Sequence, residues 1–200
     1  MAVYSPLTKP PTEAYLSEIR TFMLSNKHLR VLAEEIQALE STWKAIAGHQ
    51  YTTSTLIQGP RHIKALSNWI KYGDLTALGE ASSGIIALPF LIIIQTTQYI
   101  QYLHYYHLSH VEFLDGLRQS GGMQGYCAGL LAAFAIACSK DESEVIQNAA
   151  TALRIGLMIG AYQEAGDRDT ISGATTMVLR LSHPGQGDEI VGQFPGVSDT

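Results

Sequence analysis

The segment Gly125-Tyr126-Cys127-Ala128-Gly129 constrains the fold more than any other feature of the chain. It places a cysteine between two glycines, where a glycine-rich stretch changes into an unbroken apolar run. Flanking glycines allow a tight strand-to-helix turn, which lifts the central side chain out of the sheet. The pattern is typical of a nucleophile elbow, and it predicts a helix that starts near Ala128.

A cysteine in such a turn lies over the N-terminus of the helix that follows. The free N–H groups and the positive end of the helix dipole favour a thiolate there, and a thiolate suits acyl transfer. The alternative interpretation is structural, because glycine and cysteine are also common in tightly packed interiors. Residues 130–137 favour the elbow, because an apolar side chain at every position predicts a helix buried on all sides.

Charge and cysteine content exclude several classes of partner. The 200 residues carry a net charge of −5, and no Lys/Arg cluster alternates with aromatic residues, so we expect no nucleic acid or anionic membrane partner. The two cysteines, Cys127 and Cys138, would lie about 16 Å apart on one helix, too far apart for a disulfide. The start of the chain shows no basic and apolar leader, and we therefore expect a reducing, cytoplasmic location.

Apolar periodicity predicts a largely helical chain up to about residue 165. The expected elements are a short strand at residues 2–4 and helices at 13–24, 29–46, 59–72, 85–107, 111–117 and 142–162. The apolar run 84–94 is too short for a membrane span and is interrupted by Pro89, so we expect a buried helix there. Residues 175–181 alternate like a half-buried strand and residues 186–194 form a short helix, which predicts a core at 1–172 and an incomplete unit at 173–200.

Histidines and an arginine supply further candidate site residues. His104, His107 and His110 recur every three positions, but on a helix their side chains would fan out instead of converging, so we expect no metal site. His183 is the only histidine after Cys127 and would be the obvious base, although its turn next to a proline favours a surface position. Arg154 lies among apolar residues, either reaching the surface or holding a substrate carboxylate in a pocket.

From Gly125 to Ala137 the chain resembles the starter unit:acyl carrier protein transacylase (SAT) domain at the N-terminus of fungal non-reducing polyketide synthases. The nucleophile motif of that family is GxCxG followed by small and apolar residues. The resemblance extends through residues 145–160 and backward through Gly59-Pro60, Ala87-Leu88-Pro89 and Gln98-Tyr99. Residues 3–6 and 178–194 look like the subgroup that makes citrinin-type and azaphilone precursors.

The resemblance implies a truncated α/β fold like that of malonyl-CoA:carrier-protein transacylases, with an α/β-hydrolase-like core and the start of a ferredoxin-like subdomain. Cys127 would accept an acyl group from acyl-CoA as a thioester and pass it to the phosphopantetheine thiol of an acyl carrier protein. The backbone N–H of Ala128 would stabilise the oxyanion, and Gly125 and Gly129 would shape the turn. No bound cofactor and no metal are implied, and the partners are the carrier protein or the remainder of a synthase.

The chain departs from the family pattern in two places. The family's base histidine lies beyond the small subdomain and has no counterpart before Thr200, and Leu7 replaces a glutamine near the oxyanion hole. The missing part would also add strands, so we expect exposed apolar edges. Three hypotheses stay open at this point. The first is an acyltransferase that loads an acetyl-class starter and is inactive if truncation removes its base. The second is a non-catalytic homologue that binds a carrier protein or synthase, and the third is a metal-binding helical protein.

Overall fold

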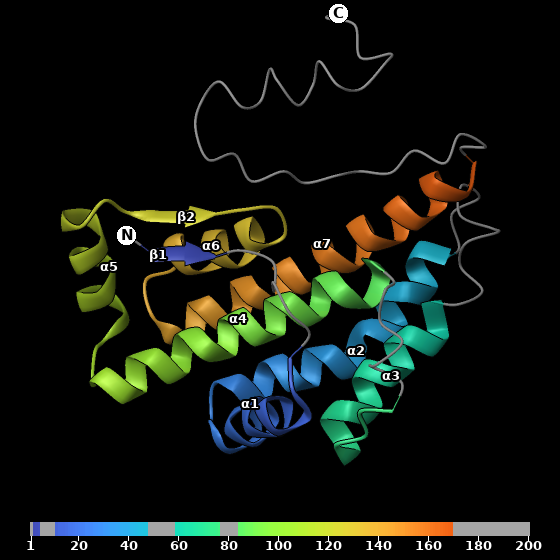
Figure 1. The fold of residues 1–200 in the computed structure, drawn as a ribbon, viewed down its shortest axis with the longest axis horizontal. Helices are drawn as coiled ribbons and strands as arrows, with labels where there is room; N and C mark the ends of the chain where they lie inside the picture. The colour runs from blue at the N-terminus through green and yellow to red at the C-terminus, as the bar shows by residue number, and fades with distance from the viewer. Residues whose placement is uncertain (1, 5–10, 48–58, 77–83, 170–200) are drawn as a thin grey trace, which may run out of the picture. The chain divides into compact units, whose positions relative to one another are not determined.

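The computed structural model describes residues 2–4, 11–47, 59–76 and 84–169 of the chain. The described elements, in chain order, are β1 (Ala2–Tyr4), α1 (Glu13–Ser25), α2 (Leu29–Ala47), α3 (Gly59–Tyr72), α4 (Gly84–Tyr106), α5 (His110–Gln119), β2 (Met123–Gly125), α6 (Gly129–Ala137) and α7 (Glu142–Asp169) (Figure 1). The chain divides into two compact units, Met1–Asp169 and Thr170–Thr200, and the second lies outside the described residues. The expected strand at 175–181, the expected helix at 186–194 and the boundary at 172 therefore stay predictions.

The helices expected from apolar periodicity are confirmed, and α7 is longer than expected because it continues past Tyr162. Local signals explain several of their ends. Thr12 caps α1 by accepting a hydrogen bond from the Tyr15 N–H, and Ser109 and Glu112 form a capping box at the start of α5. Gly73 follows α3 at a φ of +77°, a conformation that favours glycine. The described chain is helix-rich with a small sheet, which is compatible with an α/β class.

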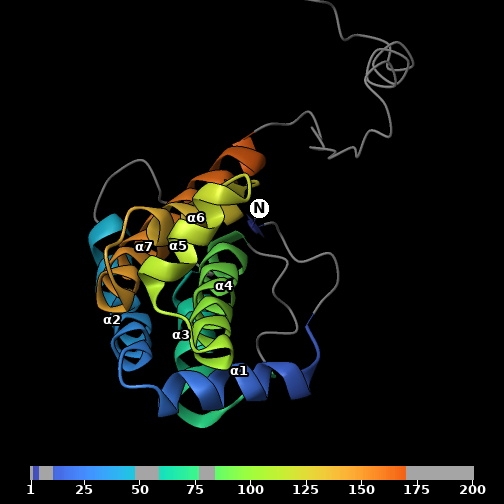
Figure 2. The same cartoon turned by 90° about the vertical axis from the view of Figure 1, so that its left-hand side faces the viewer.

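Helices α4 and α7 run side by side through the middle of the described unit (Figures 1 and 2). Glycines allow their backbones to approach closely. A Cβ atom on Gly160 of α7 would lie 2.2 Å from the carbonyl oxygen of Gly84, and one on Gly156 would lie 2.9 Å from Cδ1 of Ile92. Because α7 presents no side chain at these two positions, α4 packs closely against it, and most residues of α4 are buried.

Helix α4 is long and apolar enough to cross a membrane by length and composition alone, and it is the one such helix among the described residues. Most of its apolar window is buried inside the protein. Ile92, Ile93 and Ile94 have no exposed surface. The expectation of a buried helix at 84–94 is therefore confirmed, with Pro89 inside it.

The two described strands form a parallel pair in which Ala2, Val3 and Tyr4 lie opposite Met123, Gln124 and Gly125. Strand β1 thus comes from the start of the chain and pairs with the strand that leads into Cys127. Helix α6 follows β2 directly and packs against β2, α4 and α7. This arrangement places the Cys127 turn at the carboxyl end of the small parallel sheet, where α/β proteins commonly hold their ligands.

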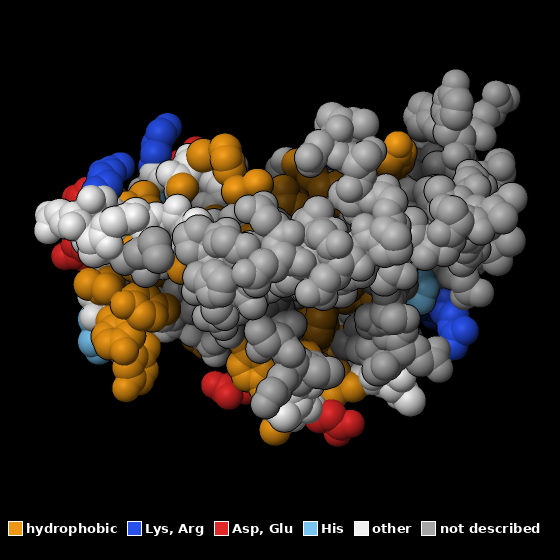
Figure 3. Space-filling view, turned by 45° about the horizontal axis from the view of Figure 1, so that its top comes forward, with side chains coloured by type: hydrophobic (Ala, Val, Ile, Leu, Met, Phe, Trp, Pro, Cys, Tyr) orange, Lys and Arg blue, Asp and Glu red, His pale blue; other side chains and the backbone are white. Residues whose placement is uncertain are grey.

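The expectation that residues 130–137 form a helix buried on all sides is wrong. Leu130 is 50% exposed and Phe134 is 64% exposed, although Ala132, Ala133 and Ile136 on the other side of α6 are buried. Helix α7 exposes Ile155 and Met158 in the same way, and apolar side chains are visible on the molecular face drawn in Figure 3. An all-apolar helix needs a layer on each side to be fully buried, and the described unit supplies a layer on one side.

Candidate active site

Cys127 lies at the tip of the turn between β2 and α6. Its φ is +53°, a left-handed conformation that is uncommon for a residue other than glycine. Three backbone hydrogen bonds maintain the turn: Tyr126 N–H to Tyr4 O at 2.7 Å, Gly129 N–H to Tyr126 O at 3.0 Å, and Leu130 N–H to Cys127 O at 3.0 Å. The expected strand–turn–helix geometry around the cysteine is therefore present.

Gly125 and Gly129 lie at the two ends of the Cys127 turn. Gly125 ends β2, where an added Cβ atom would lie only 2.4 Å from the Cα of Leu130, so the strand and the helix touch through bare backbone. Gly129 is buried and begins α6. Gly125 thus allows β2 and α6 to approach closely where the chain turns back, and the exposed Cys127 side chain lies outside this strand–helix contact.

The Cys127 thiol is free and exposed. Ala128, the N-cap of α6, supplies no side-chain hydrogen bond to the helix, and within the described part of the chain its N–H donates to no acceptor. An N–H group at a helix N-terminus is a ready donor for an oxyanion. Ala128 directly follows Cys127 in the chain, and its role as oxyanion donor stays a prediction.

None of the described acid–base side chains forms a hydrogen bond with the Cys127 thiol. His183 lies outside the described residues. His104 pairs with Glu142 at 3.5 Å, and His110 is buried between a tyrosine and a backbone carbonyl. Among the described residues, no group of three or more His, Cys, Asp or Glu side chains lies close enough to hold a metal ion.

Arg154 projects from α7, and its Nε lies 2.6 Å from Oε1 of Glu35 on α2. The hydrogen bond to Glu35 raises the pKa of the guanidinium above its ordinary value. Of the two roles considered for this residue, the structure shows a charged group at the surface that is engaged by a carboxylate of the chain itself. A role for Arg154 in substrate binding stays a prediction.

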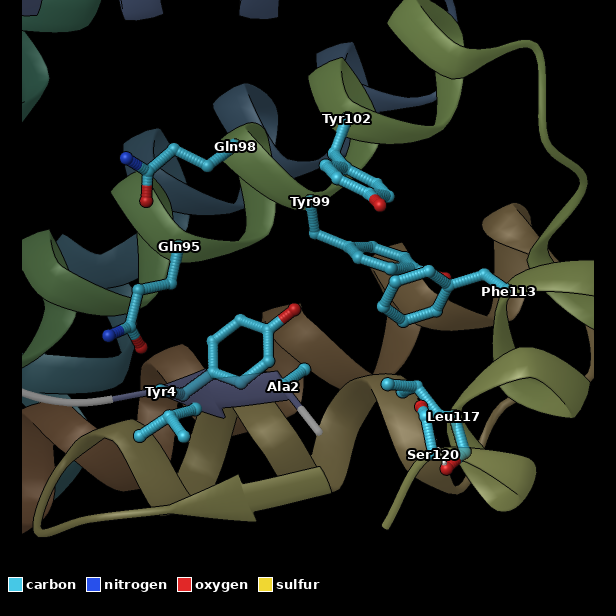
Figure 4. Close-up of a pocket in the computed structure, with 10 residues that line it drawn as sticks. Ala2, Tyr4, Gln95, Gln98, Tyr99, Tyr102, Phe113, Leu117 and Ser120 are labelled. Atoms are coloured by element: carbon cyan, nitrogen blue, oxygen red, sulfur yellow. Dashed lines mark hydrogen bonds between the residues drawn. The ribbon is translucent and has the colours of Figure 1, made fainter. Parts of the chain in front are cut away.

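A cavity of about 480 Å³ lies on the α4 side of β1 (Figure 4). Its walls come from β1, α4 and α5, and its lining residues are Ala2, Val3, Tyr4, Gln95, Gln98, Tyr99, Tyr102, Phe113, Leu117 and Ser120. Burial raises the pKa of the Tyr4 and Tyr99 phenols above the ordinary value, so both keep their proton to a higher pH than an exposed tyrosine does. The pairs Val3-Tyr4 and Gln98-Tyr99 belong to the family resemblance seen in the sequence, which predicted no role for either pair.

Comparison with known proteins agrees with this geometry. Residues 26–184 match the family model described as starter unit:ACP transacylase in aflatoxin biosynthesis. The chain belongs to the SAT family. The matched residues include α2 to α7 and the whole Cys127 turn, whereas β1 lies before the matched range.

Polyketide synthases are among the relatives of this SAT-family chain. It is 45% identical over 195 residues to the non-reducing polyketide synthase atr1 of Stereocaulon alpinum, an alignment that covers 98% of the chain and 8% of the synthase. It is 35% identical over 195 residues to the synthase stbA of Stachybotrys bisbyi, covering 98% and 9%. With the 5-methylorsellinic acid synthase of Aspergillus terreus it shares 32% over 170 residues, covering 84% and 6%. The SAT-family chain thus spans less than a tenth of the length of these relatives.

Proposed function

We propose that the chain is a starter-unit acyltransferase of fungal polyketide biosynthesis that forms a thioester on Cys127. The observation that carries the proposal is the exposed thiol at a φ of +53°, beside an N–H of Ala128 that has no acceptor within the described residues. The substrates would be an acyl-CoA and the phosphopantetheine thiol of a carrier protein, and the partner would be that carrier protein or the rest of a synthase. We also propose a cytoplasmic location.

The reaction would proceed by two thioester exchanges. The Cys127 sulfur attacks the thioester carbonyl of the acyl-CoA, a C–S bond to the cysteine forms, and the carbonyl electrons move to the oxygen. When this intermediate collapses, the C–S bond to CoA breaks and the CoA sulfur takes a proton from water. The phosphopantetheine thiol then attacks the acyl-Cys127 carbonyl in the same manner and releases the Cys127 sulfur.

The Ala128 N–H would stabilise both oxyanions. Removing one such donor typically costs about 10²–10³-fold in rate, so a single preorganised N–H supplies a substantial part of the catalysis. The proton of the Cys127 thiol would go to solvent, because no described side chain is bonded to this sulfur. Exchange of one thioester for another is close to thermoneutral, which leaves positioning and oxyanion stabilisation as the main requirements.

A second candidate function is a non-catalytic homologue that binds a carrier protein or a synthase. Two observations favour it: the absence of a described base at Cys127, and the exposed apolar side chains Leu130 and Phe134 on α6. Surfaces of this kind commonly mark contact with another polypeptide.

The intact mass of the chain after incubation with acetyl-CoA or hexanoyl-CoA distinguishes the two functions. We expect an acyl adduct on the chain and on a Cys138→Ala control, because Cys138 is also exposed and free but lies at the far end of α6. The Cys127→Ala variant should carry no adduct. A folded protein without any adduct would overturn the catalytic proposal and favour the binding function.

A further inference from the structure

His110 is a buried histidine that the proposed reaction does not use. It is the first residue of α5 and is 3% exposed. Its Nδ1 lies 2.6 Å from the Tyr99 hydroxyl of α4, and its Nε2 lies 2.8 Å from the backbone oxygen of Ser139. A carbonyl oxygen only accepts, so Nε2 carries the proton and donates to Ser139. In the neutral ring Nδ1 then accepts from the Tyr99 hydroxyl.

Ser139 lies two residues past Ala137, the last residue of α6, at the end of the helix opposite Cys127. A buried carbonyl group without a hydrogen-bond donor is costly. His110 supplies the donor for the Ser139 carbonyl, while the Ser139 hydroxyl donates to Ala135 O at 2.6 Å and accepts from Asn148 Nδ2 at 2.9 Å. The end of α6 is therefore fastened to α4 and α5 through His110 and to α7 through Asn148.

The other end of α6 is in contact with β2. Gly125 approaches the Leu130 backbone so closely that no Cβ atom fits between them, and the Leu130 N–H bonds to the carbonyl of Cys127. At about 1.5 Å per residue, the nine residues of α6 form a helix roughly 13 Å long between its contact with β2 and the hydrogen bonds of Ser139. A shift of this helix along its axis would therefore also move the turn that carries Cys127.

We propose that His110 is a positioning residue for Cys127. It acts through the Ser139 carbonyl, by fixing the axial position of α6 and with it the place of the thiol and of the Ala128 N–H. This inference rests on the proposed acyl transfer. A displacement of the reacting atoms by about 1 Å can lower the rate of such a reaction by up to about a hundredfold. The hydrogen bond from Tyr99 orients the imidazole ring so that Nε2 points to Ser139.

Two variants of His110 separate its two hydrogen bonds. The shorter amide in His110→Asn can accept from Tyr99 but cannot reach Ser139, whereas the amide nitrogen in His110→Gln can donate to Ser139. We would measure the acylation rate of Cys127 by intact mass against acetyl-CoA concentration, using the full chain with Cys138→Ala. His62→Gln, on α3 and away from α6, serves as the matched histidine control.

We expect His110→Asn to lower the maximal acylation rate about tenfold per folded molecule, with an unchanged half-saturating acetyl-CoA concentration. His110→Gln should recover most of the rate, and His62→Gln should match the parent. If both His110 variants acylate at the parent rate and differ only in melting temperature, the residue has a structural role and the proposal fails. Should His110→Asn not fold, Tyr99→Phe takes its place, and an unchanged rate there also overturns the proposal.

Failure of the proposed acyl transfer would be seen separately, as a parent protein that forms no adduct. The alkylation rate of Cys127 by iodoacetamide then tests the positioning role without acyl-CoA. Alkylation about tenfold slower in His110→Asn than in the parent and in His62→Gln supports the proposal. Equal alkylation rates in all three proteins refute it.

Discussion

Substitution of Gly125 by alanine tests the contact between β2 and α6 most directly. The new Cβ atom would lie 2.4 Å from the Leu130 Cα, 2.8 Å from the Leu130 N and 2.9 Å from the Gly129 O. All three are backbone atoms, so no side chain can rotate away to relieve the overlap. Ordinary contact begins at 3.4 Å, so the first turn of α6 must retreat from the strand by about 1 Å.

The overlap determines the expected magnitude. Overpacking of this kind costs about 1–3 kcal/mol, partly offset by the 0.4–1 kcal/mol that an alanine gains by restricting the unfolded chain. We therefore expect a net loss of about 1–2 kcal/mol, or about 2–8 °C in melting temperature for a chain of this size. A 1 Å displacement of Cys127 should lower its acylation rate by up to about a hundredfold.

Melting temperature and Cys127 acylation, measured on the same preparations, check both numbers. Gly116→Ala is the matched control, because Gly116 lies inside α5 and a Cβ atom there meets nothing within 4 Å. This control should gain about 0.5–1 kcal/mol from its improved helix propensity and acylate normally. A Gly125→Ala protein with the melting temperature and the acylation rate of the parent would refute the argument that the strand and the helix touch through bare backbone.

Three further experiments test other parts of the structure. Gly160→Ala should destabilise the protein by about 1–3 kcal/mol in urea titrations, because its Cβ atom would lie 2.2 Å from the Gly84 carbonyl oxygen; unchanged stability would contradict the close α4–α7 crossing. Burial raises the pKa of Tyr99, so above pH 10 the unfolded chain loses this proton before the folded one. Stability should therefore fall above pH 10, and Tyr99 contributes about 1.4 kcal/mol per pH unit to this fall. Burial also raises the pKa of Tyr4, which adds a slope of its own, so Tyr99→Phe should make the total slope shallower by about 1.4 kcal/mol per pH unit. A double-mutant cycle on the pair of half-exposed Arg154 and the less exposed Glu35 should give a coupling of at most about 1 kcal/mol, and a larger value would show that the pair is more than a surface ion pair.

Features set by neighbouring residues could be predicted from the sequence. The helices follow from apolar periodicity, and their ends follow from residues such as Thr12 and Gly73, whose preferences act within one turn. The turn at Cys127 is local in the same sense, because a strand, two glycines and an apolar helix lie within fifteen residues. The sequence therefore predicted the strand–turn–helix arrangement around Cys127, whereas the positive φ of the cysteine itself is known from the structure.

The surroundings of α6 could not be predicted in this way. An unbroken apolar sequence indicates that the helix can be buried on every side, but not which sides other elements cover, and Leu130 and Phe134 are exposed. The histidines pose the same difficulty. Helix α4 ends at Tyr106 and His107 has a φ of +53°, so the residues from His104 to His110 do not share one helix. Of the two hydrogen-bond partners of His110, Ser139 lies 29 positions along the chain, a separation at which residue spacing carries no information.

The same difference between local and distant features leads to a last prediction about catalysis. The nucleophile and the Ala128 N–H both belong to the turn, whereas a base must come from another element, and no described side chain is bonded to Cys127. Base catalysis typically contributes about 10²–10⁴-fold, so a small diffusible base should replace part of it at an exposed thiol. We expect imidazole, at constant pH and ionic strength, to accelerate acylation of the parent in proportion to its concentration. An acylation rate independent of imidazole would mean that proton removal does not limit the reaction, and Cys127 would then need no base to form the thioester.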